Sequence, residues 1–322
     1  MKAVILEAYN PEERLRVADD WPRPVRRKGE VLVRVAATAV NRSVYKTATG
    51  FIPRFMAALP KVPGGDLAGE VVEGDEAGTF QPGDRAFACV DGWRPEVAWG
   101  TYAELCSVPA AHLARIPEGV SYTDAAALCL TALTAFQALK AARLQPGQRV
   151  LVHAAAGGVG SAAVQIAKAQ GMQVVATASA ANAEFARSLG ADQVIDYKQQ
   201  RFEEVLAGSP VDAVIDTIGG EYERRSLQVL KRSGTFVNLF AQFSLWPIVK
   251  GKLRALLRLG PRYETLFVSA GQDMQQVAEL VAAGRLRPHV QAVMPLEQAS
   301  EAHRMVYSGH TRGKVVLQVR AE

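Results

Sequence analysis

The chain has 322 residues, of which 49% are hydrophobic and 21% charged, and its formal net charge is +5 at pH 7. These values are ordinary for a soluble globular protein, and the chain is long enough for two domains. The sequence has no run of 18 apolar residues and its first residues do not have the form of a signal peptide, so we expect neither a membrane-spanning helix nor secretion.

Three cysteines, Cys89, Cys106 and Cys129, lie far apart and form no CxxC pair. They predict no disulfide framework and no cysteine-rich zinc site, and they fit a cytoplasmic location. Two basic clusters, at residues 23–28 and 250–262, are interpreted as solvated faces. No nucleic-acid motif accompanies them, so nucleic acid is not an expected partner.

In chain order, the first 120 residues carry short alternating segments separated by Gly/Pro turns. Strands are expected at 30–35, 69–73 and 102–105, which indicates a small domain resembling a β-barrel. From Ser121 the composition changes to an Ala/Leu-rich, capped helix. A second helix carries Thr134 and ends before Gln145.

Strands and helices then alternate, which predicts an α/β fold with a doubly wound parallel sheet. Its strands are expected at 150–153, 173–177, 193–195, 211–215, 234–239 and 265–268. Beyond residue 270, helices at 273–283 and 298–307 and a strand at 314–319 close the chain. The basic segment Trp246–Gly260 is interpreted as a connecting helix; the alternative is a helix at a membrane surface, so membrane association is not expected.

The first of these parallel strands leads into a turn of small residues, Ala155–Gly160, and a helix over Val159–Gln170. This is the arrangement of a dinucleotide-binding unit, in which Gly157 lets the backbone approach a pyrophosphate and Gly160 lets the helix pack closely on the strand. The phosphates are expected at the helix N-terminus, where free N–H groups favour an anion.

The cofactor can be argued from the end of the second parallel strand, where an NAD-specific unit has an Asp or Glu. The segment Ala176–Ser179 has no acid, and Ser179 stands in its place. Ser179, Asn182 and Tyr197 are therefore predicted to hydrogen-bond the 2′-phosphate of NADPH.

The chain resembles the medium-chain dehydrogenase/reductase superfamily, and within it the zinc-free quinone oxidoreductases and alkenal/enone reductases. The resemblance rests on Pro63–Val71, Gly83–Arg85, Ala155–Gly160, Asp216–Gly220 and Gly309–Val316. It implies a GroES-like β-barrel domain, residues 1–122 completed by 271–322, and a Rossmann domain, residues 123–270. It also implies a homodimer.

Zinc alcohol dehydrogenases of this superfamily place a Cys near the position of Asn41 and a His-Glu pair near Gly65 and Asp66. Neither Asn41 nor Gly65 supplies a thiolate or imidazole. The segment between Arg85 and Gly100 has a single cysteine, so the structural zinc lobe is missing too. We therefore predict a metal-free enzyme.

Without a Lewis acid, conjugated acceptors are favoured over alcohols and simple carbonyls. The expected activity is NADPH-dependent reduction of quinones or of the conjugated double bond of α,β-unsaturated carbonyls by direct hydride transfer. Two alternatives stay open, a non-catalytic NADPH-binding or sensing protein and an enoyl reductase for carrier-bound substrates.

The resemblance implies roles for particular residues. Thr134 would reach the cofactor near its nicotinamide end, Thr217 and Ile218 would line the adenine or ribose side, and Tyr197 matches a tyrosine that relatives use for NADPH. Ala180 and Ala181 depart from the Arg or Lys that relatives often have there. The remaining predicted cofactor contacts are Ala156, Gly157, Gly158, Val159 and Gly160 in the turn, and Phe240, Ala241, Phe267 and Val268 at strand ends.

Three residues are candidates for contact with the acceptor. Asn41 matches an asparagine that relatives place between cofactor and substrate, where its amide would donate to the developing oxyanion. Tyr45 and Lys46 are further donor candidates. The alternatives are an Asn41 that satisfies its own turn, a solvated Lys46, a Thr134 that bonds its own helix and a Phe240 that packs in the core.

Overall fold

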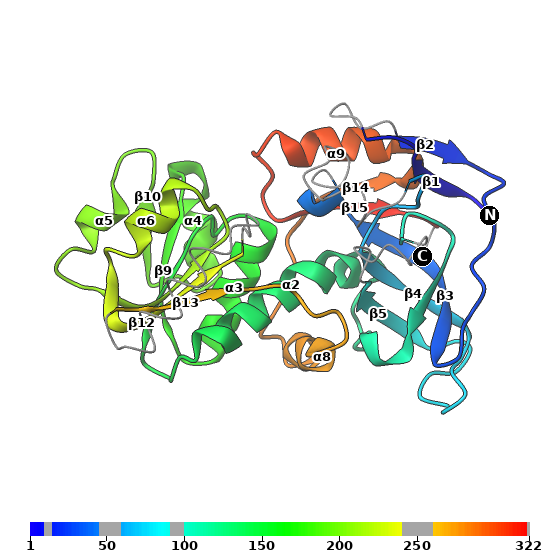
Figure 1. Ribbon diagram of the computed structural model, residues 1–322, viewed down its shortest axis with the longest axis horizontal. Coiled ribbons are helices and arrows are strands. Elements are labelled where there is room, and N and C mark those ends of the chain that lie inside the picture. The colour runs from blue at the N-terminus through cyan, green and yellow to red at the C-terminus, as the bar shows by residue number, and fades with distance from the viewer. Residues whose placement is uncertain (10–14, 45–58, 91–99, 240–259, 321–322) are drawn as a thin grey trace. The chain divides into compact units, whose positions relative to one another are not determined.

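The computed structural model describes residues 1–9, 15–44, 59–90, 100–239 and 260–320. The chain forms two compact units (Figure 1), one of residues Met1–Leu133 with Ser269–Glu322 and the other of residues Thr134–Val268. The predicted boundary after residue 122 differs from this division, which falls inside helix α2 (Tyr122–Ala142). The prediction of two helices here was wrong, because no Gly or Pro interrupts the Ala/Leu-rich segment.

Helix α2 is also the one helix of the described chain that is long and apolar enough to cross a membrane, with a mean hydropathy of 1.5 over its 18-residue window. Of that window, 78% is buried inside the protein. Its apolar character is therefore that of a core helix.

The first unit is built on a seven-stranded sheet in which β3 (Glu30–Ala39) is central. Sheet order runs β14 (Val290–Pro295), β15 (Lys314–Gln318), β3, β4 (Asp66–Glu73), β5 (Arg85–Cys89) and β7 (Leu113–Arg115), and β6 (Leu105–Pro109) also pairs with β3. The strand expected at 102–105 thus starts where that prediction ended. Strands β1 (Ala3–Leu6) and β2 (Leu15–Ala18) form a separate antiparallel pair.

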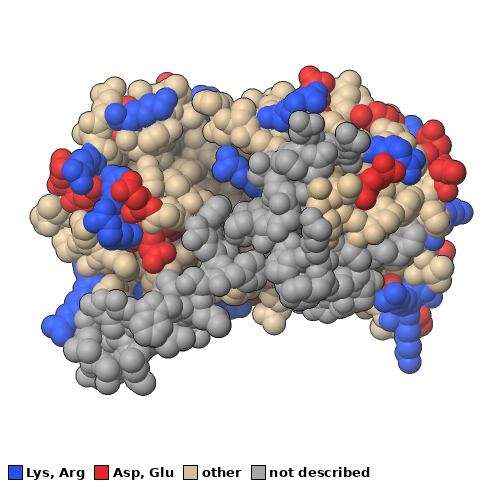
Figure 2. All heavy atoms as spheres, turned by 45° about the horizontal axis from the view of Figure 1, so that its top comes forward, with Lys and Arg blue, Asp and Glu red and all other residues tan. Residues whose placement is uncertain are grey.

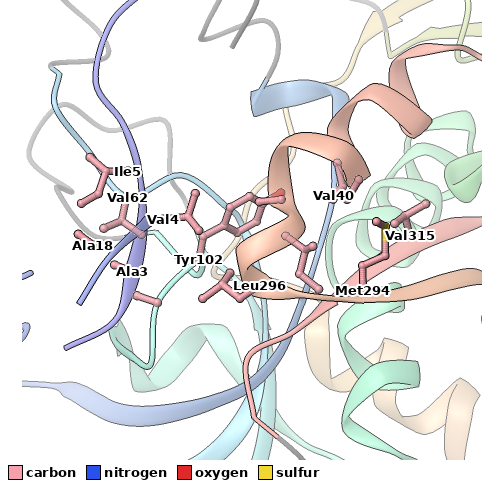
Figure 3. Close-up of a cluster of buried hydrophobic side chains, with 14 residues drawn as sticks. Ala3, Val4, Ile5, Ala18, Val40, Val62, Tyr102, Met294, Leu296 and Val315 are labelled. Atoms are coloured by element: carbon pink, nitrogen blue, oxygen red, sulfur yellow. The ribbon is translucent and has the colours of Figure 1, made fainter. Parts of the chain in front are cut away.

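The C-terminal segment supplies part of the core of this unit, as Figure 3 shows. Met294, Leu296 and Val315 pack in one buried cluster with Val4 and Tyr102 from the N-terminal segment. The segment contains α8 (Met274–Ala282), α9 (Ala299–Tyr307) and the short 3-10 helix η3 (Leu296–Gln298); a second, η2 (Ala110–His112), precedes β7.

A buried polar contact adds to this packing. The Tyr102 hydroxyl lies 2.8 Å from Nε2 of His303 in α9, and the two rings meet edge to face. The C-terminal segment is thus tied to the N-terminal part of the unit by both apolar and polar contacts.

The second unit is a six-stranded parallel sheet in the order β10-β9-β8-β11-β12-β13. Its strands are β8 (Arg149–Val152), β9 (Gln173–Ala178), β10 (Gln193–Asp196), β11 (Val211–Asp216), β12 (Leu230–Asn238) and β13 (Arg262–Thr265). Its helices include α3 (Gly158–Ala169), α4 (Ala180–Ser188), α5 (Phe202–Val205) and α6 (Glu221–Ser226). This confirms the predicted doubly wound fold.

One predicted strand of this sheet was displaced. Residues 262–265, not 265–268, pair with β12, and the apolar residues Leu266–Val268 follow the strand. Phe267 is 66% exposed, so the apolar run that suggested the strand is not buried in the sheet.

The basic cluster at residues 23–28 lies among acidic side chains. Arg26 approaches Glu73 at 3.6 Å and Glu76 at 2.7 Å. Over the described residues on the face in Figure 2, Lys and Arg are interspersed with Asp and Glu. The described residues on this face therefore form no stripe of a single sign of charge. The connecting helix predicted over Trp246–Gly260 lies, except for Gly260, outside the described residues.

Candidate nucleotide-binding and active site

The strand order of the parallel sheet reverses between β8 and β11, which start helical connections to opposite sides. In such sheets a ligand binds in the crevice at the carboxyl ends of the strands, next to this reversal. Several of the predicted cofactor residues follow the ends of these strands: the glycine turn follows β8, Ser179 follows β9, Tyr197 follows β10, and Thr217 follows β11.

The turn after β8 is held by backbone contacts. Gly157 N–H donates to the Ala154 carbonyl at 2.9 Å, and Ala155 N–H donates to the Thr177 carbonyl at 3.0 Å. Gly157 caps α3 without a side chain, so the first N–H groups of the helix face the turn without an intrahelical acceptor. A Cβ on Gly160 would lie 2.2 Å from the Ala154 carbonyl oxygen, so only glycine fits there. Helix N-termini of this kind bind phosphate groups, so the pyrophosphate contact at this turn remains a prediction.

A buried carboxylate, which was named from the sequence only as part of a family motif, shapes the turn after β11. Asp216 is fully buried, and its Oδ1 accepts N–H bonds from Ile218 at 2.8 Å and Gly219 at 3.0 Å. Burial raises the pKa of Asp216, and these two hydrogen bonds oppose the rise. Thr217 Oγ1 donates to the His153 carbonyl at 3.1 Å, which links this turn to the one after β8.

At the end of β9, Ser179 is the N-cap residue of α4, and Asn182 Nδ2 donates to its Oγ at 3.3 Å. Tyr197 is 46% exposed. These residues remain predicted contacts of a 2′-phosphate. The residue at this strand end is a serine and not the Asp or Glu of an NAD-specific unit.

A polar pocket lies beside Tyr197. It is lined by residues 197–201 after β10 and by Glu221, Arg224 and Arg225 of α6. Four of its residues are cationic and one is anionic, so an anion is the ligand that its charge favours. This pocket was not predicted from the sequence, because a compensating cation was expected only directly after Ser179.

The pocket's cations differ in how firmly they are engaged. Arg225 donates to both oxygens of Glu203, at 2.9 and 2.8 Å, and stacks on Phe202. Burial works against ionisation of Glu203, but the hydrogen bonds from Arg225 lower its pKa to about 2. The side chain of Arg224 is 73% exposed, and its ion pair with Glu221 is a loose one of 3.9 Å. Lys198 is exposed as well. Arg224 and Lys198 are therefore the cations that can turn to a ligand.

In the first unit, Asn41 lies in a buried polar network rather than bonding only within its own turn. Its Nδ2 donates to Asp66 Oδ2 at 2.7 Å, and its Oδ1 accepts from Lys314 Nζ at 2.6 Å. Lys314 Nζ also approaches Asp66 Oδ2 at 3.2 Å and the Val40 carbonyl at 3.0 Å. Sequence reasoning included neither Asp66 nor Lys314 among the site residues.

The remaining predicted contacts are placed separately. Thr134 is buried in α2, and Phe267 and Val268 follow β13. Tyr45, Lys46, Phe240 and Ala241 lie outside the described residues.

The residues at the superfamily's catalytic-zinc positions do not fit that metal. Asn41 supplies an amide, Gly65 has no side chain, and the Asp66 carboxylate is occupied by an ammonium group. Within the described part of the chain, no group of three His, Cys, Asp or Glu side chains is placed to hold a metal. Zinc takes thiolate, imidazole or carboxylate ligands, and this set offers none that is free.

Comparison with known proteins settles the family. Residues 27–118 match the model of the alcohol dehydrogenase GroES-like domain, and residues 189–317 match the model described as zinc-binding dehydrogenase. The mitochondrial NAD(P)H oxidoreductase RTN4IP1 of Mus musculus is 32% identical over 99% of this chain and 89% of its own length. The chain belongs to the medium-chain dehydrogenase/reductase superfamily, in its quinone oxidoreductase branch.

Two further relatives agree with this assignment. The quinone oxidoreductase from Coxiella burnetii has a structure that matches 99% of both chains with a TM-score of 0.87 and 32% identity. The 2-methylene-furan-3-one reductase of Solanum lycopersicum is 29% identical over 98% of this chain and 79% of its own. This member of the branch is thus a quinone oxidoreductase-like enzyme that uses a nicotinamide cofactor, and it has the predicted GroES-like domain and Rossmann-like parallel sheet.

Proposed function

We propose that this oxidoreductase uses NADPH, without zinc, to reduce quinones or the conjugated double bond of α,β-unsaturated carbonyls by direct hydride transfer. The observation that carries the proposal is the buried network at the superfamily's zinc position, where the Lys314 ammonium lies among three oxygen acceptors. A second cation there would meet strong repulsion and no free ligand.

This network bears on the class of acceptor. A saturated carbonyl or an alcohol needs a Lewis acid or a strong proton donor at its oxygen. In a conjugated acceptor the hydride adds to carbon while charge moves to the distant oxygen, and hydrogen-bond donors suffice to stabilise it. Bound NADPH would supply the hydride, and the chain would bind, orient and desolvate the two reactants.

We propose that Lys198 and Arg224 assist Ser179, Asn182 and Tyr197 in binding the 2′-phosphate. Replacing either cation with alanine is expected to weaken NADPH binding about tenfold, the effect of losing one exposed charge-assisted contact. Binding of NADH, which lacks this phosphate, should change little. Calorimetric titration of each variant with both cofactors measures the difference.

Arg187→Ala is the matched control, because Arg187 is an exposed cation of the same unit and does not line the pocket. Equal weakening of NADPH and NADH binding in the Lys198 and Arg224 variants would contradict the proposed phosphate contact. Equal affinity of the wild type for both cofactors would contradict the NADPH preference itself.

The function is tested by oxidation of NADPH with a panel of acceptors: a naphthoquinone, a short 2-alkenal, a cyclic enone and a saturated aldehyde. The expected result is turnover of conjugated acceptors only, and it should persist after dialysis against a chelator. Reduction of the saturated aldehyde that is lost with the chelator would contradict the proposal. Tight NADPH binding without turnover would favour a sensing protein or a carrier-bound substrate.

A further inference from the structure

The network around Asn41 follows from the topology of the first sheet. Strands β4 and β15 flank β3 and run antiparallel to it. The first residues of β4 and β15 therefore lie beside the end of β3. Those residues are Asp66 and Lys314, and Asn41 follows β3 after one residue.

The two charged groups of this network, Lys314 and Asp66, are fully paired. An ammonium group has three hydrogens, and Lys314 has three acceptors within 3.2 Å. Asp66 is fully buried; Oδ2 accepts from Asn41 and Lys314, and Oδ1 accepts from the Leu130 N–H at 2.8 Å. Lys314 is 5% exposed. A buried ion pair so satisfied holds one geometry, because any rotation leaves a charge unpaired.

The amide of Asn41 is fixed by both partners at once. Its oxygen must face the ammonium and its nitrogen must face the carboxylate, so the reversed amide would place like groups together. One Nδ2 hydrogen is used by Asp66. The other has only a long contact, 3.4 Å to the Ala39 carbonyl. That hydrogen is the one that a developing oxyanion can take.

We infer that Lys314 and Asp66 are positioning residues, which hold the Asn41 amide so that its second Nδ2 hydrogen is presented to the oxygen of the acceptor. The inference rests on the proposed function, since it gives Asn41 a role in that reaction. The ammonium on Asn41 Oδ1 also polarises the amide towards stronger donation. In this way an internal cation acts on the acceptor through Asn41.

The first test observes the amide itself, without any reaction. The chain has four asparagines, at positions 10, 41, 182 and 238, so asparagine-selective ¹⁵N labelling gives few side-chain amide signals. The Asn41 pair is the one absent from the spectrum of Asn41→Ala. In the wild type, we expect slow exchange with solvent for the Asn41 Nδ2 hydrogen that is donated to Asp66. Fast exchange of both hydrogens would show a mobile amide and overturn the inference.

The second test measures kinetics in variants that keep the volume of the network. Lys314→Met leaves Asp66 buried and unpaired, so the Lys314→Met/Asp66→Asn double variant, which removes both charges, is made beside it. We expect kcat with a conjugated acceptor to fall at least tenfold in each, with unchanged affinity for NADPH. Asn41→Ala should cause a similar loss, and adding Lys314→Met to it should cause little more.

The outcomes separate the possibilities. Losses that multiply in the combined variant, or full kcat in the charge-free double variant, would show that the network only supports the fold. Lys231→Met, which breaks the Lys231–Asp212 pair of the other unit, is the control for loss of a lysine and should leave kcat unchanged. Absence of wild-type turnover would instead contradict the proposed function, while the amide spectrum would still report on the network.

Discussion

Alanine at Gly157 is expected to weaken NADPH binding by about 100-fold, equivalent to ~2.7 kcal/mol, while changing the melting temperature little. A Cβ on this residue would meet only the Ala154 carbonyl oxygen, at an ordinary 3.4 Å, and the φ of −79° suits any residue. The fold therefore tolerates the methyl group. A pyrophosphate that approaches the backbone here would not.

Alanine at Gly160 is expected to act on the fold itself. Its Cβ would lie 2.2 Å from the Ala154 carbonyl oxygen and 2.8 Å from Ala155 Cα, both backbone atoms. Helix α3 must then shift from the turn, at a cost of about 3 kcal/mol by analogy with overpacked cores. Thermal unfolding without cofactor should show the loss, and calorimetry should show the Gly157→Ala effect.

Gly208→Ala is the control for both, because its Cβ would meet nothing within 4 Å. If Gly157→Ala and Gly160→Ala lowered stability equally and Gly157→Ala kept full affinity for NADPH, the turn after β8 would not be the pyrophosphate site.

The second large effect is expected at His153, whose side chain is fully buried at the end of β8. Its Nδ1 lies 3.1 Å from Thr177 Oγ1 and its Nε2 lies 2.9 Å from Ser226 Oγ, and its ring meets those of Phe202 and Tyr222 edge to face. Burial, assisted by the nearby Arg225 charge, lowers the pKa of His153 to about 3 from the ordinary 6.5. The folded protein therefore holds this ring neutral.

The sign of the pH dependence follows from this shift. Between pH 6.5 and about 3 the unfolded chain binds a proton that the folded chain does not, so acid favours unfolding. The slope from this residue approaches ~1.4 kcal/mol per pH unit. Above pH 6.5 the residue is neutral in both states and contributes no pH dependence.

His153→Gln removes the titration and keeps a side chain that hydrogen-bonds. Chemical denaturation of both proteins from neutral pH to about pH 5 should show a steeper loss of stability in the wild type. In this range the carboxylates contribute little, and the other histidines cancel between the two proteins. Parallel curves would show that His153 is not held neutral in the folded state.

Local patterns predicted much of the fold. The alternation of apolar strands with helices predicted five of the six parallel strands within a few residues. These strands are buried in the sheet, so each one is a short apolar run that can be recognised without knowing its neighbours. The glycine turn could be predicted for the same reason, because its small residues are required by contacts with residues only a few positions away. To recognise that Ser179 stands where an NAD-specific unit has an acid, only the end of one strand had to be predicted.

The site residues that were not predicted are brought together by elements far apart in the sequence. Asp66 and Lys314 meet Asn41 only because β4 and β15 flank β3 with their first residues at its end. Arg224 reaches the pocket beside Tyr197 from α6, a separate element. The single helix α2 was divided in the prediction, although no Gly or Pro interrupts its sequence.

The most direct test of direct hydride transfer to a conjugated acceptor uses NADPH deuterated at the transferring carbon and a cyclic enone, with the product analysed by mass spectrometry and NMR. The proposal predicts a saturated ketone with one deuterium at the carbon β to the carbonyl, formed by chelator-treated enzyme. A reduced product without deuterium, or with the carbonyl reduced to an alcohol and the double bond intact, would contradict it.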